Sequence, residues 1–316
     1  MRPDQLGDFR VPSDARLHPD GRRVVFVVTQ MDLDEDRYVR RIWLWDVDEA
    51  RPLTSGGMDT TPRWSPDGSR LAFLRKGPGD EDRPQVAILR LDGGEAAVIT
   101  EFELGATEIA WSPDGSKIAV VASEWIEEWK DLDKEERGRL PRRITRLGYR
   151  FDSRGWIHDK RSHIWLIDVD GSSDPVCLTP GDFNEGQIVW SPEGESIAFV
   201  SARHAERFFD EGSQIWTVPA SGGGSVPLGA VGTWGQPSYD RSGDLCAVGV
   251  DGQWAHPDVN PLQRRGSDGS WSRVTTVDRN LVTFAPVLSP GGPQWLDDGT
   301  ALSTLEDSGR VRIVRI

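Results

Sequence analysis

A short phrase recurs along this chain and marks a tight turn between two apolar segments. Its complete copies read Trp-Ser-Pro-Asp-Gly or Trp-Ser-Pro-Glu-Gly, and weaker copies keep the closing glycine. The turn glycines are Gly21, Gly68, Gly115, Gly194, Gly243 and Gly299. Proline presets φ at the second turn position, the acidic residue bonds to the backbone, and glycine takes a left-handed φ. Because an apolar run follows each turn, the sequence predicts six β-hairpins in one chain.

The spacing of these turns predicts a β-propeller. The first two intervals between turn glycines are 47 residues, which is typical of a four-stranded propeller blade. The second half of each unit supplies two more strands, as in 41–47 with 51–54. We therefore expect an all-β fold of four-stranded blades, five complete blades plus most of a sixth, in a single domain over residues 1–316. The last unit has only three strands before Ile316, so the sequence looks cut short.

Composition excludes several classes of partner. The chain carries 51 acidic and 37 basic side chains, for a formal net charge of −14. This charge argues against a nucleic-acid backbone or an anionic membrane as the main partner. No segment approaches the ~20 apolar residues of a membrane span, and residues 1–30 lack the pattern of a secretory leader. We therefore predict a cytoplasmic protein, in which Cys177 and Cys246 are buried free thiols in preference to a disulfide.

One interval between the turns is much longer than the others. The third interval is 79 residues, so it holds an insertion of roughly 30 residues above the repeat. We place this insertion in blade three, over residues 124–161, and expect both helix and strand within it. Residues 123–132 predict a short amphipathic helix, with Trp125 and Trp129 on its apolar face and Ser123 as its N-cap.

Charge is divided sharply along the insertion. Residues 124–136 carry seven acidic and two basic side chains, whereas residues 137–161 carry nine basic and two acidic ones. The candidate substrate-binding residues are Arg146, Arg150 and Arg154. Guanidinium groups bind carboxylates in a bidentate manner, so these side chains suit a peptide carboxylate or an acidic side chain. The alternative, which the usual behaviour of surface charge favours, is ion pairing with residues 124–136 or with neighbouring blades.

No other pattern supplies chemistry. The five histidines include no metal-ligand spacing such as H-E-x-x-H, and the glycines at 222–224 lack the lysine of a P-loop. The turn aspartates are explained by their turn role. Trp43, Trp165 and Trp216 recur at one repeat position, which favours packing between blades. We therefore expect no metal, no cofactor and no catalytic residue in this chain.

Two further segments carry a likeness to a known family. They are PRRITRLGYRFDSRGW at residues 141–156 and HIWLID at 163–168. Together they resemble the propeller of acylaminoacyl-peptidase-like members of the prolyl oligopeptidase family, as do the lead-in at 2–17 and the stretch at 210–220. The resemblance implies a seven-bladed propeller in front of an α/β-hydrolase domain with a Ser-Asp-His triad. It also implies that the propeller caps the active site, excludes folded proteins and supplies part of the peptide-binding surface.

The sequence departs from this family in its chemistry. It contains no G-x-S-x-G nucleophile elbow, since Ser225 and Ser267 lie in glycine-rich turn segments without the required strand–turn–helix context. We therefore predict a non-catalytic, substrate-gating and recognition propeller of such a serine peptidase, with the hydrolase domain expected after residue 316.

The partners expected from this assignment are a peptide substrate and the chain's own hydrolase domain, without nucleic acid or membrane, and homo-oligomerisation stays open. A stand-alone TolB-like propeller, acting as a protein-interaction module, is the alternative, and a propeller glycosidase or lactonase is a weaker third.

Overall fold

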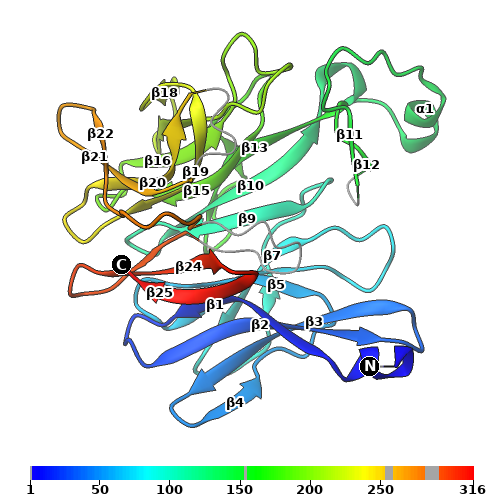
Figure 1. Ribbon diagram of the computed structural model, residues 1–316. Helices are drawn as coiled ribbons and strands as arrows, with labels where there is room; N and C mark the ends of the chain where they lie inside the picture. The colour runs from blue at the N-terminus through cyan, green and yellow to red at the C-terminus, as the bar shows by residue number, and fades with distance from the viewer. Residues whose placement is uncertain (1, 153–154, 253–258, 282–291) are drawn as a thin grey trace.

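The chain forms a β-propeller whose sheets follow one another around the molecule, with the last sheet beside the first (Figure 1). The computed structural model describes residues 2–152, 155–252, 259–281 and 292–316. Over these ranges five sheets have four antiparallel strands and a sixth has three, apart from one two-stranded hairpin in the insertion. The prediction of an all-β propeller with five complete blades and three strands of a sixth is therefore confirmed.

The strands of each blade pair in chain order. After a 3-10 helix, η1 (Pro3–Asp8), blade one contains β1 (Arg10–Leu17), β2 (Arg23–Asp32), β3 (Arg37–Asp46) and β4 (Glu49–Pro52). Blade two contains β5 (Asp59–Trp64), β6 (Arg70–Arg75), β7 (Gln85–Arg90) and β8 (Ala97–Val98). Blade three contains β9 (Ala106–Trp111), β10 (Lys117–Trp125), β13 (Lys160–Asp168) and β14 (Val176–Cys177).

The remaining blades follow the same plan. Blade four contains β15 (Glu185–Trp190), β16 (Ser196–Ser201), β17 (Gln214–Pro219) and β18 (Val226–Pro227). Blade five contains β19 (Gly232–Tyr239), β20 (Leu245–Asp251), β21 (Leu262–Arg265) and β22 (Trp271–Arg273). Blade six contains β23 (Gln294–Trp295), β24 (Ala301–Asp307) and β25 (Arg310–Arg315). First strands of successive blades contact one another from β1 to β19, so they form the inner wall of the propeller.

The repeated phrase forms the expected turns between first and second strands. Gly68 and Gly115 both have a φ of 70°, which glycine adopts without a steric penalty. The N–H of Gly115 donates to the carbonyl of Ser112 at 2.9 Å, and the N–H of Gly68 donates to that of Ser65 at 2.8 Å. These bonds close each turn, so the local sequence alone determines where the hairpins fall.

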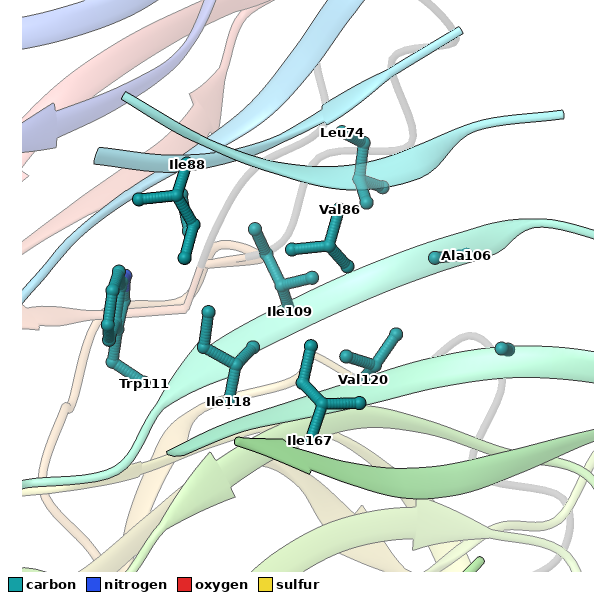
Figure 2. Packing of buried hydrophobic residues seen from close by; sticks show 11 residues of the cluster. Leu74, Val86, Ile88, Ala106, Ile109, Trp111, Ile118, Val120 and Ile167 are labelled. Carbon is teal, nitrogen blue, oxygen red and sulfur yellow. The ribbon is translucent and has the colours of Figure 1, made fainter. Parts of the chain in front are cut away.

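The hydrophobic core consists of layers between neighbouring blades. The layer between blades two and three includes Val86 and Ile88 from β7, Ile109 from β9 and Ile118 from β10 (Figure 2). Its buried side chains contribute on the order of 1.5–3 kcal/mol each to folding. Trp165 also packs against this layer. Trp216 packs against the corresponding layer of blades three and four. The expectation of packing between blades is confirmed for Trp165 and Trp216, and for Trp43 it stays a prediction.

The tryptophans of the repeated phrase tie each blade to the one before it. Each indole N–H donates to a main-chain carbonyl on the first strand of the preceding blade. The donor–acceptor pairs are Trp64–Arg16 (3.1 Å), Trp111–Arg63 (3.0 Å) and Trp190–Ala110 (3.0 Å). Each acceptor residue directly precedes the residue that, in the acceptor's blade, occupies the position of the tryptophan. The same tryptophan therefore packs in a core layer and bonds across the blade interface.

The last three interfaces of the inner wall use other pairs of donor and acceptor groups. Between blades four and five, Gln187 accepts a hydrogen bond from the N–H of Gln236. Between blades five and six, Trp295 Nε1 donates to Ser238 Oγ at 3.1 Å. Gln294 then joins blade six to blade one through the backbone of β1. Side-chain hydrogen bonds thus link all six neighbouring pairs of first strands.

The helix expected over residues 123–132 was a wrong prediction. Ser123 and Trp125 belong to β10 and pair with Ser162 and Lys160 of β13, because a long antiparallel ladder outweighs a local amphipathic pattern. The α-helix, α1 (Lys134–Arg139), begins later, where Asp133 is its N-cap. No helix in the described part of the chain is long and apolar enough to cross a membrane.

Both cysteines are free thiols, as expected. Cys246 is buried and Cys177 is half-buried. Burial raises the pKa of each thiol to about 11, so neither has the low thiol pKa of a reactive cysteine.

Candidate functional site

The candidate site is the insertion between β10 and β13. These two strands pair over their whole length and end at the pair Trp125–Lys160, where the insertion leaves the sheet. It contains a 3-10 helix, η2 (Glu127–Trp129), then α1, and a hairpin of β11 (Arg150–Phe151) and β12 (Gly155–Trp156). Figure 1 shows α1, β11 and β12 gathered beyond the upper end of these two strands, at one corner of the molecule. The insertion is therefore a small projecting unit on a rigid support.

Arg142 anchors the insertion. Its guanidinium lies over the rings of Trp129 and Trp156, at 4.8 Å and 4.7 Å from their centroids. Its Nε and Nη2 atoms both lie 3.3 Å from Asp159 Oδ2. Asp159 and Trp129 are buried, and cation–π contacts strengthen where water is excluded. Arg142 therefore joins η2, the β11–β12 hairpin and the start of β13.

A second contact fixes the root of the insertion to blade two. Arg137 lies over Trp125 at 4.3 Å, and its Nη1 atom donates to Glu103 at 2.9 Å. Trp125 Nε1 donates to the same carboxylate at 2.8 Å. Burial alone would raise the pKa of Glu103, but the hydrogen bonds from Trp125 and Arg137 hold it below its ordinary value. Arg137 therefore ties α1 to the segment between blades two and three.

Arg146, the first predicted binding residue, is engaged by blade four. It forms an ion pair with Asp182 in the segment that leads into β15, and Arg161 Nε donates to the same carboxylate at 2.7 Å. The Arg146 guanidinium also lies over the Phe208 ring at 4.4 Å. Burial alone would raise the pKa of Asp182, but hydrogen bonds from Arg146 and Arg161 hold it below its ordinary value. This is the ion pairing with a neighbouring blade that was the alternative to substrate binding.

Arg150, the second predicted binding residue, has no carboxylate partner within the described ranges. It lies in β11 opposite Trp156, with its guanidinium 5.8 Å from that ring, and it is exposed. Arg154, the third, lies outside the described residues. The structure therefore brings Arg146 and Arg150 onto one small unit but directs them to different neighbours, and the binding role of all three stays a prediction.

The insertion exposes apolar side chains as well as basic ones. Leu147 is 70% exposed, Phe151 is 62% exposed and Ile144 is 49% exposed. Exposed large apolar side chains gathered on one projecting segment are typical of an interaction surface. Together with Arg150, they give this surface the chemistry to hold an extended peptide or another protein surface.

One buried polar cluster beside the insertion was not predicted. His163 is 1% exposed, and its Nδ1 atom lies 3.2 Å from Glu185 Oε2. Arg203 donates to the other oxygen of Glu185. A single sequence could not reveal this cluster, because its members lie on three strands or loops of two blades. In the part of the chain that the structure describes, no group of three or more His, Cys, Asp or Glu residues could hold a metal.

Sequence comparisons relate the chain to peptidases. No family model matches it. It is 31% identical over 194 residues to the uncharacterized peptidase YuxL of Bacillus subtilis. The aligned region covers 59% of this chain and 29% of YuxL. It is 24% identical over 268 residues to dipeptidyl-peptidase 5 of Porphyromonas endodontalis, which covers 77% of this chain and 37% of that protein. The matched region thus spans well under half the length of these curated relatives.

Structural comparisons give the same fold. The acylaminoacyl peptidase of Pyrococcus horikoshii superposes with a TM-score of 0.74 at 17% identity, over 98% of this chain and 45% of that one. The β-propeller domain of the Trilobed protease from Pyrococcus furiosus superposes with a TM-score of 0.64 at 16% identity, over 98% of this chain and 83% of that one. The putative TolB of Agrobacterium tumefaciens superposes with a TM-score of 0.57 at 18% identity, over 97% of this chain and 91% of that one. At these identities the likeness concerns the fold alone.

Proposed function

We propose that this chain, a six-bladed propeller homologous to part of a peptidase, is the substrate-gating and recognition propeller of an acylaminoacyl-peptidase-like serine peptidase. In this proposal the chain has no catalytic triad. The nucleophile belongs to an α/β-hydrolase domain of the same protein, and the propeller admits short peptides to it while excluding folded proteins. Of the predicted binding residues that the structure describes, Arg150 is better placed than Arg146 to meet a peptide, because it is exposed and has no carboxylate partner in the described ranges.

The observation that carries this proposal is the match to YuxL. A 31% identity over 194 residues concerns the sequence itself, whereas shape alone is shared by propellers with unrelated functions. The superposition on the acylaminoacyl peptidase of P. horikoshii supports the proposal, since this chain corresponds to 45% of that longer protein.

Hydrolysis assays test the proposal with two protein samples. The chain of residues 1–316 should not hydrolyse acetyl-alanine p-nitroanilide. The full-length protein should hydrolyse it, should be inhibited by a fluorophosphonate and should leave a folded protein substrate intact. Fluorophosphonate-sensitive turnover by the 316-residue chain would contradict the assignment of the nucleophile, and a full-length protein without hydrolase activity would contradict the proposal as a whole.

The alternative function is a stand-alone TolB-like interaction propeller. The observation that favours it is the superposition on the putative TolB, which covers 97% of this chain and 91% of the other. The reading frame after residue 316 distinguishes the two functions, because a G-x-S-x-G elbow followed by Asp and His belongs only to the peptidase. A cytoplasmic location is part of the leading proposal and is tested by cell fractionation.

A further inference from the structure

The inner wall of the propeller has the same backbone irregularity in four blades. In each of these blades, the residue three positions before the last residue of the first strand has a left-handed φ although it is not glycine. These residues are Asp14 (φ 46°), Thr61 (56°), Gln187 (55°) and Gln236 (54°). Each lies at a shift in register between the first and second strands. Bulges of this kind re-aim side chains, and such strain is concentrated at functional sites.

At the first of these bulges, two guanidinium groups share one carboxylate. Arg16 Nε donates to Asp14 Oδ1 at 2.8 Å, and Arg16 Nη2 lies 2.6 Å from the same oxygen. Arg63 Nη1, from the first strand of blade two, donates to Asp14 Oδ2 at 2.9 Å and to the Pro62 carbonyl at 2.7 Å. Both oxygens of Asp14 are therefore occupied, while each guanidinium keeps further N–H groups for another acceptor.

Among the described residues, positive charge exceeds negative charge at this point of the wall. Asp14 compensates only one of the two cations, and their side chains remain 16% (Arg16) and 27% (Arg63) exposed. Glu108 occupies in blade three the position that Asp14 occupies in blade one. It accepts a hydrogen bond from the N–H of Ile188 across the interface between blades three and four. Burial and the neighbouring Arg63 lower the pKa of Arg16 to about 10, the direction expected for a cation that lacks sufficient negative charge.

We propose that Arg16 and Arg63 form a binding site for a carboxylate on the inner wall of the propeller, and that a peptide supplies this carboxylate. Two guanidinium groups in fixed positions suit planar, bidentate recognition of such a group, and Asp14 holds both in place. The site rests on the proposed function for the identity of its ligand, since a recognition propeller receives peptides. The carboxylate has two sources, a free C-terminus or an acidic side chain.

Binding to the 316-residue chain tests the site without any hydrolysis. The first pair of probes is acetyl-trialanine with a free C-terminus and its C-terminal amide. The second pair is acetyl-Ala-Asp-Ala-amide and acetyl-Ala-Asn-Ala-amide. Calorimetry should show that the acid form binds about tenfold more tightly than its uncharged partner in at least one pair, and that pair identifies the source. Equal binding within both pairs would overturn the site, while the hydrolysis assays still decide the proposed function.

Variants separate a binding role from a structural one. Arg63→Gln and Arg16→Gln each leave Asp14 with one arginine, so the chain should stay folded and the preference for the acid probe should disappear. Asp14→Asn keeps a residue suited to left-handed φ and raises the local positive charge, so it should strengthen that preference. Arg51→Gln, in the outermost strand of blade one, is the matched control and should change nothing. A preference that survives both arginine variants, or one that Asp14→Asn weakens, would overturn the proposal.

Discussion

The side chain of Gln294 closes the propeller onto Leu17. Its Oε1 atom accepts a hydrogen bond from the N–H of Leu17 at 3.1 Å, and its Nε2 atom donates to the carbonyl of Ala15 at 3.0 Å. Four of the other interfaces are joined by the tryptophan that opens the turn phrase of the later blade, whereas blade one has Leu17 at that position. Two backbone groups of β1 are thus satisfied by an amide that is 277 residues away from Leu17 in the sequence.

Replacing this amide should loosen the seam between blades six and one. Gln294→Leu keeps the approximate volume but leaves the Leu17 N–H and the Ala15 carbonyl without these partners, so we expect a loss of about 1–3 kcal/mol in the free energy of unfolding. Hydrogen exchange at the Leu17 amide gives the site-specific readout. Protection there should fall in Gln294→Leu and persist in Trp295→Phe, which removes the bond to Ser238 instead. Unchanged protection of Leu17 in the glutamine variant would contradict this role.

Two tryptophans of the same core layer, Trp111 and Trp165, should differ in their tolerance of phenylalanine. Trp111 Nε1 donates to the carbonyl of Arg63, whereas Trp165 Nε1 is buried and has no hydrogen-bond partner among the described residues. Both substitutions remove a similar volume, but only Trp111→Phe deprives a carbonyl of its donor. We expect Trp111→Phe to cost about 1–3 kcal/mol more than Trp165→Phe. Urea unfolding of the two variants measures the difference, and equal midpoints with equal slopes would exclude a contribution from the indole bond.

The sequence predicted the features that depend on short segments and on their repetition. The turn at Gly115 needs only the residues around it, and the interval of 47 residues implied the number of blades. The bond from Trp111 to Arg63 spans 48 residues, almost one repeat, but the repeated phrase did not predict it. The repeat indicates that neighbouring blades meet in the same way at each interface, but not which polar atoms meet there.

The insertion was less predictable because its contacts obey no repeat. Arg146 reaches Asp182 in the approach to blade four, 36 residues further along the chain, and no local pattern identifies that partner. The helix at 123–132 failed for a related reason, since Trp125 is held in a strand by Lys160 on the far side of the insertion. Long-range pairing decided both outcomes.

Loss of Arg142 should release the insertion without unfolding the propeller. The variant Arg142→Ala removes the contacts with Trp129, Trp156 and Asp159 together and leaves a buried carboxylate without its cation. Chymotrypsin should then cleave faster after Leu147 or Phe151, which are exposed on this unit, while the thermal midpoint of the blades changes little.

Two further variants make this test specific. Arg143→Ala is the matched control, because within the described ranges the Arg143 side chain forms no ion pair, hydrogen bond or ring contact, and it should be cleaved at the wild-type rate. Arg142→Lys keeps the charge but not the planar group, so its rate should fall between the two. Equal cleavage of the Arg142→Ala and Arg143→Ala variants would show that other contacts hold the insertion.

Acid should weaken the turns through their aspartates. Asp114 accepts hydrogen bonds from Ser112 Oγ at 2.6 Å and from the N–H and Oγ of Ser116 at 3.0 Å and 2.8 Å. The bond from Ser112 is the main cause that lowers the pKa of Asp114 from 3.8 to about 2. A carboxylate whose pKa is lower in the folded than in the unfolded state stabilises the folded state. This contribution is complete above the unfolded-state pKa and is lost as the pH falls through the folded-state pKa.

The contribution of Asp114 should therefore be complete above about pH 4 and absent below about pH 2, and for so exposed a carboxylate it should not exceed about 1 kcal/mol. Asp114→Asn retains a turn-forming side chain that does not titrate, so its unfolding free energy should approach that of the wild type as the pH falls. Urea unfolding at several pH values, followed by tryptophan fluorescence, measures this convergence. A difference between Asp114→Asn and the wild type that stays constant at every pH would show that the charge of Asp114 does not stabilise the turn.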